Sequence, residues 1–131
     1  MIKGLSHIGI VVANMEETVE AFKKLGFKVD KLQEVKERMA KSALLSAGKV
    51  QVELIQPTAK EGRMAEFLAK TGGGLHHIAL SVKDLDGYLK VLKDKGIPTD
   101  DLHPHVGWWG IREVFLPSKS VENVILELDE T

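Results

Sequence analysis

Residues 6–27 read SHIGIVVANMEETVEAFKKLGF, and residues 76–97 read HHIALSVKDLDGYLKVLKDKGI. His7 corresponds to His77 and Gly26 to Gly96, each pair being 70 residues apart. Both copies begin with the alternation of apolar residues that is typical of a strand, and both continue with a helical pattern that ends at the glycine. The two stretches therefore predict an internal duplication.

A second pair of segments extends the repeat. Residues 50–55 read VQVELI and residues 124–128 read VILEL, with Glu53 and Glu127 at matching places 74 residues apart. Each half of the chain then reads strand, helix, strands. The fold class predicted is α+β, with two βαβββ modules that form a curved mixed sheet around a metal-binding cleft. We expect a single domain, 1–131, with modules at about 1–58 and 73–131 joined by a short helix at 61–70.

The element boundaries follow from local signals. Asn14 and Asp84 suit helix N-caps because a short side-chain oxygen accepts an orphan amide hydrogen; Glu17 stands three residues after Asn14, as in a capping box. Gly48 and Lys49 indicate a hairpin turn. The predicted strands are 6–12, 33–37, 42–46 and 50–55 in the first half, and 76–82, a segment near Pro98, 112–116 and 124–128 in the second.

Four ionisable side chains recur at duplicated strand positions. Strand alternation places each of them opposite the apolar face that its helix would cover. A single strand Glu or His is usually just a solvated or satisfied polar residue, so the argument depends on the set. Two His and two Glu form an N2O2 donor group that suits Co, Mn, Ni, Zn or Fe(II). The predicted metal ligands are His7, Glu53, His77 and Glu127.

Composition limits the other possibilities. The 131 residues are 44% hydrophobic and 28% charged, with a net charge of -1, which favours neither nucleic acid nor an anionic membrane as a partner. The chain has no cysteine, which excludes disulfides, thiolate metal sites and cysteine nucleophiles. The apolar start is too short to span a bilayer, so we expect no signal peptide and no membrane segment, and a cytoplasmic protein.

These motifs resemble the vicinal oxygen chelate superfamily, which includes glyoxalase I, extradiol dioxygenases, bleomycin-resistance proteins and methylmalonyl-CoA epimerases. The resemblance covers essentially the whole chain and is nearest to the epimerases. It is carried by GGLHHIA at 73–79, VELIQP at 52–57, and FLPSK at 115–119 followed by ILEL at 125–128.

The resemblance implies a cofactor, a substrate and a mechanism. A divalent metal (Co, Mn, Ni or Zn) on the four ligands would stabilise an enolate while a methylmalonyl-CoA-like acyl thioester undergoes 1,1-proton transfer. The family's acid/base residues fall on Glu37 and Glu127, with Glu34 as a competitor for the place of Glu37. A small-molecule acyl-CoA partner and a homodimer are expected, with no nucleic acid or membrane partner.

Some residues depart from the epimerase pattern and keep other functions open. Trp108 and Trp109 stand between glycines where the family has small residues. They either narrow an acyl pocket or stack on a flat part of the substrate, or else they cover a sheet edge or a subunit contact. The alternatives are a glyoxalase I-like lyase or isomerase and a non-catalytic binding protein of the bleomycin-resistance type, although the latter lacks the ligand set. The remaining loop histidines and cations are expected to be incidental or solvated: His103, His105, Arg112 and Lys119.

Overall fold

The computed structural model describes every residue from 1 to 131. Contacts divide the chain into two compact units. The first unit comprises residues 7–76, and the second comprises residues 1–6 together with 77–131. None of the three helices is long and apolar enough to cross a membrane.

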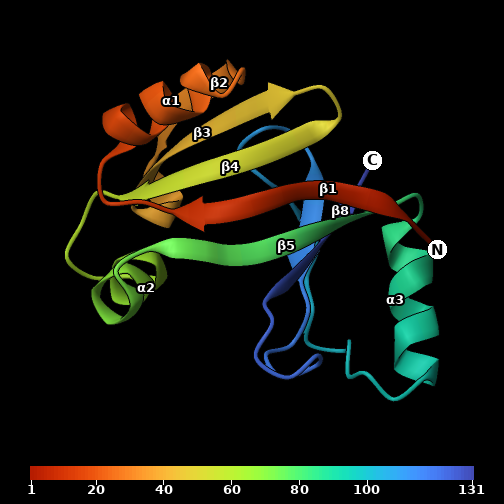
Figure 1. Ribbon diagram of the computed structural model, residues 1–131. Coiled ribbons are helices and arrows are strands. Elements are labelled where there is room, and N and C mark those ends of the chain that lie inside the picture. The colour runs from red at the N-terminus through yellow and green to blue at the C-terminus, as the bar shows by residue number, and fades with distance from the viewer. The chain divides into compact units, whose positions relative to one another are not determined.

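The first unit is built on four strands in the order β2-β3-β4-β1 (Figure 1). Strand β1 (Ile2–Val11) is parallel to β4 (Val50–Pro57), while β3 (Ala40–Ala47) is antiparallel to both β4 and β2 (Lys28–Val35). Helix α1 (Met15–Lys24) packs on β2 and β4. Its apolar side chains, with alternate residues of β1 and β4, form one hydrophobic core because these strands present their apolar faces to the helix.

The second unit repeats this plan with the strand order β5-β8-β7-β6. Strand β5 (Gly74–Val82) is parallel to β8 (Leu126–Glu130), β7 (Arg112–Phe115) is antiparallel to β8, and the short β6 (His105–Val106) completes the row. Helix α3 (Leu85–Asp94) packs on β8 and supplies three buried leucines to its own core.

Strand registers confirm the duplication and the α+β class with two βαβββ modules. Glu53 lies opposite Gly9 in the first unit, and Glu127 lies opposite Ala79 in the second, so the two pairings agree with the repeat. The predicted caps are also confirmed: Asn14 accepts from the amide of Glu17, and Asp84 accepts from that of Gly87.

A hydrogen bond that recurs in both modules links the start of each helix to the last strand of its own module. The amide of Met15 donates to Gln56 Oε1 at 2.6 Å, and the amide of Leu85 donates to Glu130 Oε2 at 2.8 Å. Each bond satisfies an amide that the first turn of a helix leaves without a partner inside the helix.

Helix α2 (Arg63–Thr71) follows β4 and packs against Val11, Ala40 and Ile55. Gly72 ends the helix in the left-handed conformation, and Gly73 continues with φ of 97°. A Cβ atom on Gly73 would lie 2.8 Å from the carbonyl oxygen of Val11, so the close approach of the chain here requires glycine.

Three predicted elements were wrong in place. The strand predicted at 33–37 is β2 at Lys28–Val35, and Lys36–Arg38 form a 3-10 turn (η1), so Glu37 does not lie on a strand. No strand forms near Pro98, which has no amide hydrogen for a ladder; β6 comes later, at His105–Val106. The last strand begins at Leu126 rather than Val124, because the Val124 amide closes a turn on the carbonyl of Val121.

Candidate functional site

The first His–Glu pair joins β1 to β4 within the first unit. His7 Nε2 lies 3.5 Å from Glu53 Oε1, and the two residues are 1% and 3% exposed. The parallel register places Glu53 opposite Gly9, on the face of β1 that also carries His7. Glycine at position 9 adds no side chain between the imidazole and the carboxylate.

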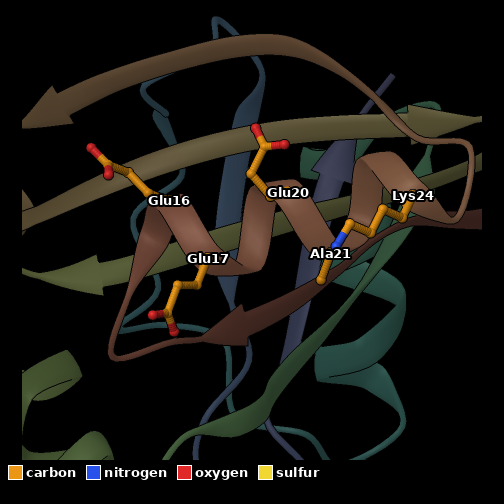
Figure 2. Close-up of a pocket in the computed structure, with 5 residues that line it drawn as sticks. All are labelled: Glu16, Glu17, Glu20, Ala21 and Lys24. Carbon is orange, nitrogen blue, oxygen red and sulfur yellow. The ribbon is translucent and has the colours of Figure 1, made fainter.

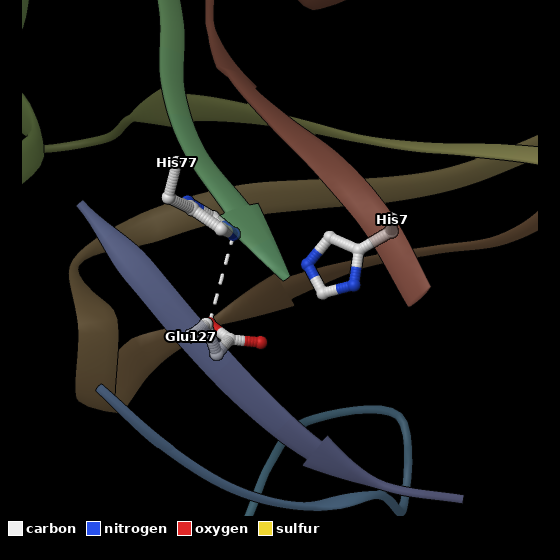
Figure 3. Close-up of side chains that lie close together, drawn as sticks. All are labelled: His7, His77 and Glu127. Carbon is white, nitrogen blue, oxygen red and sulfur yellow. Dashed lines mark ion pairs between the residues drawn. The ribbon is translucent and has the colours of Figure 1, made fainter. Parts of the chain in front are cut away.

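The second pair repeats this arrangement within the second unit. His77 Nε2 lies 3.6 Å from Glu127 Oε2, and the residues are 3% and 2% exposed. Figure 3 shows the imidazole of His77 directed at the carboxylate of Glu127 across the space between β5 and β8. The ring of His77 also makes an edge contact with Phe115, which limits how the imidazole can turn.

The separations of 3.5 and 3.6 Å are close to those of two ligands of one cation. Charge-assisted hydrogen bonds between nitrogen and carboxylate are usually about 2.7–2.9 Å long, shorter than either separation. Two donor atoms bound about 2.1 Å from the same ion are about 3.0–3.4 Å apart in octahedral or tetrahedral geometry. Each unit thus holds a buried imidazole and a buried carboxylate with the chemistry and approximate spacing of metal ligands.

Sequence reasoning did not find Arg38, which is a partner of Glu53 in addition to His7. Arg38 Nη1 donates to Glu53 Oε2 at 2.9 Å, so one carboxylate oxygen faces His7 and the other faces Arg38. In the sequence Arg38 belongs to a run of charges at 36–38, which by itself indicates an exposed surface. Only the path of the turn after β2 brings its guanidinium to β4.

A cluster of three buried carboxylates was also missed. Glu113, Glu127 and Asp129 offer oxygen atoms within 4.8 Å of one another in the second unit. Glu113 lies opposite Asp129 across the β7–β8 ladder, and Ser6 donates a hydrogen bond to Asp129. The alternation of Glu127 and Asp129 could have suggested a shared face, but β7 had to be paired with β8 before Glu113 could be added. Because three ionised carboxylates repel, a proton or a cation would stabilise this cluster.

The two candidate acid/base residues outside the buried pairs lie at the surface. Glu37 is exposed in the 3-10 turn, and Glu34 is exposed near the end of β2. Glu37 is the residue before Arg38, so the bond from Arg38 to Glu53 attaches its turn to the first His–Glu pair. Glu34 lies two residues before that turn, on β2, and its neighbour Val35 is an apolar residue that cannot form such an ion pair.

Other residues considered from the sequence have ordinary surroundings. The ring of His76 packs edge-on against Phe67. Arg112 is paired with Asp86. Trp108 and Trp109 are half-buried in the turn between β6 and β7.

Two further places do not resemble a binding site. His103 is exposed, and His105 lies 3.8 Å from Glu113 with most of its side chain in solvent. A shallow pocket on the outer surface of α1 is open to solvent and carries mainly charged side chains, which is typical of a solvated helix face (Figure 2). It is lined by Glu16, Glu17, Glu20, Ala21 and Lys24.

Comparison with known proteins gives consistent results. The family model of the Glyoxalase/Bleomycin resistance protein/Dioxygenase superfamily matches residues 6–115. The chain is 32% identical to the uncharacterized protein YqjC of Bacillus subtilis (strain 168), over 96% of this chain and 91% of that protein. It is 30% identical to the mitochondrial methylmalonyl-CoA epimerase of Dictyostelium discoideum, over 96% of this chain and 77% of the relative.

Solved structures agree with these relatives. A Streptomyces coelicolor methylmalonyl-CoA epimerase variant in complex with 2-nitronate-propionyl-CoA superposes with a TM-score of 0.89 and 30% identity, over 100% of this chain and 99% of the other. The methylmalonyl-CoA epimerase of Mycobacterium tuberculosis gives a TM-score of 0.89 and 28% identity, over 98% of this chain and 88% of the other. The relatives named as epimerases are isomerases.

Proposed function

Because this chain belongs to the Glyoxalase/Bleomycin resistance protein/Dioxygenase superfamily, we propose that it is a metal-dependent epimerase of a methylmalonyl-CoA-like acyl thioester. The observation that carries the proposal is the pair of buried His–Glu sets at equivalent positions of the two modules. The names of three of these relatives support the substrate class, since they are methylmalonyl-CoA epimerases and one was solved with an acyl-CoA analogue.

His7, Glu53, His77 and Glu127 would together hold one divalent ion, with Co, Mn, Ni and Zn as the candidates. Two imidazole nitrogens and two carboxylate oxygens are a donor set that these ions accept, and the spacing within each pair is compatible with it. When bound, such an ion supplies Lewis-acid stabilisation of the negative charge that develops on the thioester oxygen. Burial of all four side chains keeps water from competing with them.

The protein's own carboxylates would move the proton. Glu37 takes the α-proton on one face of the substrate or returns it there, and Glu127 serves the other face. The surface position of Glu37 suits a group that meets substrate only when it binds, whereas the burial of Glu127 fixes its carboxylate beside His77. A glyoxalase I-like reaction would use the same ligands with a glutathione adduct, so it is the alternative to exclude. A homodimer and a cytoplasmic location stay predictions.

The test is proton NMR of methylmalonyl-CoA in deuterated buffer with cobalt-loaded protein, following loss of the α-proton signal. We expect exchange well above the uncatalysed rate, and loss of that exchange after treatment with a chelator. A metal-bound protein that exchanges no proton from this substrate would contradict the epimerase proposal. Conversion of a glutathione hemithioacetal under the same conditions would then support the lyase alternative.

A further inference from the structure

Arg38 and His7 contact different oxygens of the same carboxylate. Arg38 Nη1 lies 2.9 Å from Glu53 Oε2, and His7 Nε2 lies 3.5 Å from Glu53 Oε1. The geometry points to Arg38 as a positioning residue that fixes Glu53 as a one-oxygen metal ligand and ties the turn carrying Glu37 to it. This inference rests on the proposed function, because it assigns Arg38 a part in the same site.

The distances indicate that one oxygen of Glu53 is bound by Arg38 and that the other is left for the metal. The contact to Arg38 is as short as a charge-assisted hydrogen bond, so Oε2 is already engaged. The contact to His7 is longer and leaves Oε1 directed to the imidazole side, where a shared cation would bind. Carboxylates that bind metals are commonly held by such outer hydrogen bonds, which orient the ligand oxygen.

Burial makes this bond effective. The side chain of Glu53 is 4% exposed and that of Arg38 is 23% exposed, so water screens the pair less than it would a surface ion pair. The guanidinium is planar and always charged, and it presents its donors in fixed directions. Arg38 can therefore hold the carboxylate in one orientation whether or not an ion is bound.

The backbone around Arg38 makes the turn a defined structure. Met39 adopts the left-handed conformation with φ of 51°, and its amide donates to the carbonyl of Lys36 at 3.0 Å. The Met39 carbonyl accepts from the amide of Thr58 at 2.9 Å, just beyond the end of β4. In a 3-10 turn, consecutive side chains point about 120° apart, so Arg38 reaches Glu53 while Glu37 stays exposed.

The turn is thus attached at two places, to Glu53 on β4 and to Thr58 just after β4. The Thr58–Met39 bond uses only backbone atoms, so a change of the Arg38 side chain leaves that attachment in place. The bond from Arg38 to Glu53 is the one attachment of the two that a substitution can remove. Removing it is expected to loosen both the ligand carboxylate and the neighbouring Glu37 without unfolding the turn.

The test compares Arg38→Met with Lys36→Met, an exposed cation of the same turn that serves as the matched control. Isothermal titration of the metal-free proteins with cobalt gives the dissociation constant. We expect Arg38→Met to weaken cobalt binding about 10–100-fold, the usual effect of losing an outer hydrogen bond to a ligand. Arg38→Lys should recover part of this loss, because it keeps the charge but not the planar fork. Thermal unfolding of the metal-free variants checks that all three are folded.

A double-mutant cycle in kcat tests the link to Glu37. If Arg38 positions Glu37, the effect of Arg38→Met on kcat should be much smaller in a Glu37→Gln background than in the wild type. The inference would be overturned if folded Arg38→Met bound cobalt as tightly as the wild type, or if the effects of Arg38→Met and Glu37→Gln on kcat were fully additive. In either case, activity of the wild-type protein would still support the proposed function. A wild-type protein that neither binds cobalt nor exchanges the α-proton would overturn both.

Discussion

Glu53 lies opposite Gly9 in the parallel ladder between β1 and β4, which places its carboxylate on the face that carries His7. The same relationship joins Glu127 and Ala79 between β5 and β8. Both glutamates therefore lie next to a histidine of the neighbouring strand and opposite a residue with little or no side chain. This shared geometry makes the two modules equivalent contributors to the proposed metal site.

Equivalence of the modules predicts equivalent losses of metal binding. His7→Ala and His77→Ala should each weaken cobalt binding by more than about 100-fold, since losing a ligand should cost more than losing an outer contact. Titration calorimetry measures both constants, and His103→Ala, a change at an exposed loop histidine, is the control. Wild-type affinity in either ligand variant would remove that histidine from the site.

The acid/base assignment predicts a difference between two neighbouring glutamates. Glu37→Gln should lower kcat for epimerisation by about 10²–10⁴-fold, the usual contribution of a general acid or base, while cobalt binding changes little. Glu34→Gln should retain near wild-type kcat because Glu34 lies on β2, outside the turn that Arg38 attaches to Glu53. Steady-state kinetics with both diastereomers of the acyl-CoA substrate measures these effects on kcat. The reverse pattern would assign the acid/base role to Glu34.

Two serine hydroxyls, one with a hydrogen-bond partner and one without, predict opposite changes in stability. The hydroxyl of Ser42 is buried without a hydrogen-bond partner, so Ser42→Ala should raise the free energy of unfolding by about 1 kcal/mol. The hydroxyl of Ser6 donates to buried Asp129, so Ser6→Ala should lower the free energy of unfolding by about 1.5–3 kcal/mol. Urea unfolding measures both changes. Destabilisation by Ser42→Ala would mean that its hydroxyl has a partner in solution.

The pair formed by Arg112 and Asp86 predicts a pH dependence of stability. Hydrogen bonds from the Arg112 guanidinium, at 2.9 and 3.1 Å, hold the pKa of Asp86 below its usual value. Because the folded-state pKa is the lower one, the stabilisation is present above the unfolded pKa of about 3.9 and is lost as pH falls through the folded pKa. Asp86→Asn should therefore destabilise the protein at pH 7 and have progressively less effect below about pH 4.

Urea unfolding at several pH values measures this dependence. The effect should be small in absolute terms, since the ion pair is exposed. Asp101→Asn, at another exposed carboxylate, is the control and should show no comparable change. An Asp86→Asn effect that stays constant down to pH 2 would contradict the assignment to the Arg112 pair.

The sequence by itself determined the duplication, and with it most of the fold. The repeat of His7 at His77 and of Glu53 at Glu127 predicted two equivalent modules, because residues at the same position of a repeated unit meet the same neighbours. Alternation along each strand separated the buried apolar face from the His–Glu face, and the caps at Asn14 and Asp84 located the helix starts.

Tertiary structure alone decided which charged residues join these pairs. Arg38 lies in a run of charges that predicts a surface, and it reaches Glu53 only because a 3-10 turn replaces the end of the predicted strand. Glu113 joins Glu127 and Asp129 only through the β7–β8 register. The strand expected near Pro98 forms instead at His105–Val106. Local patterns report periodicity within a segment, whereas the pairing of distant segments depends on backbone hydrogen bonds and turns that no single segment encodes.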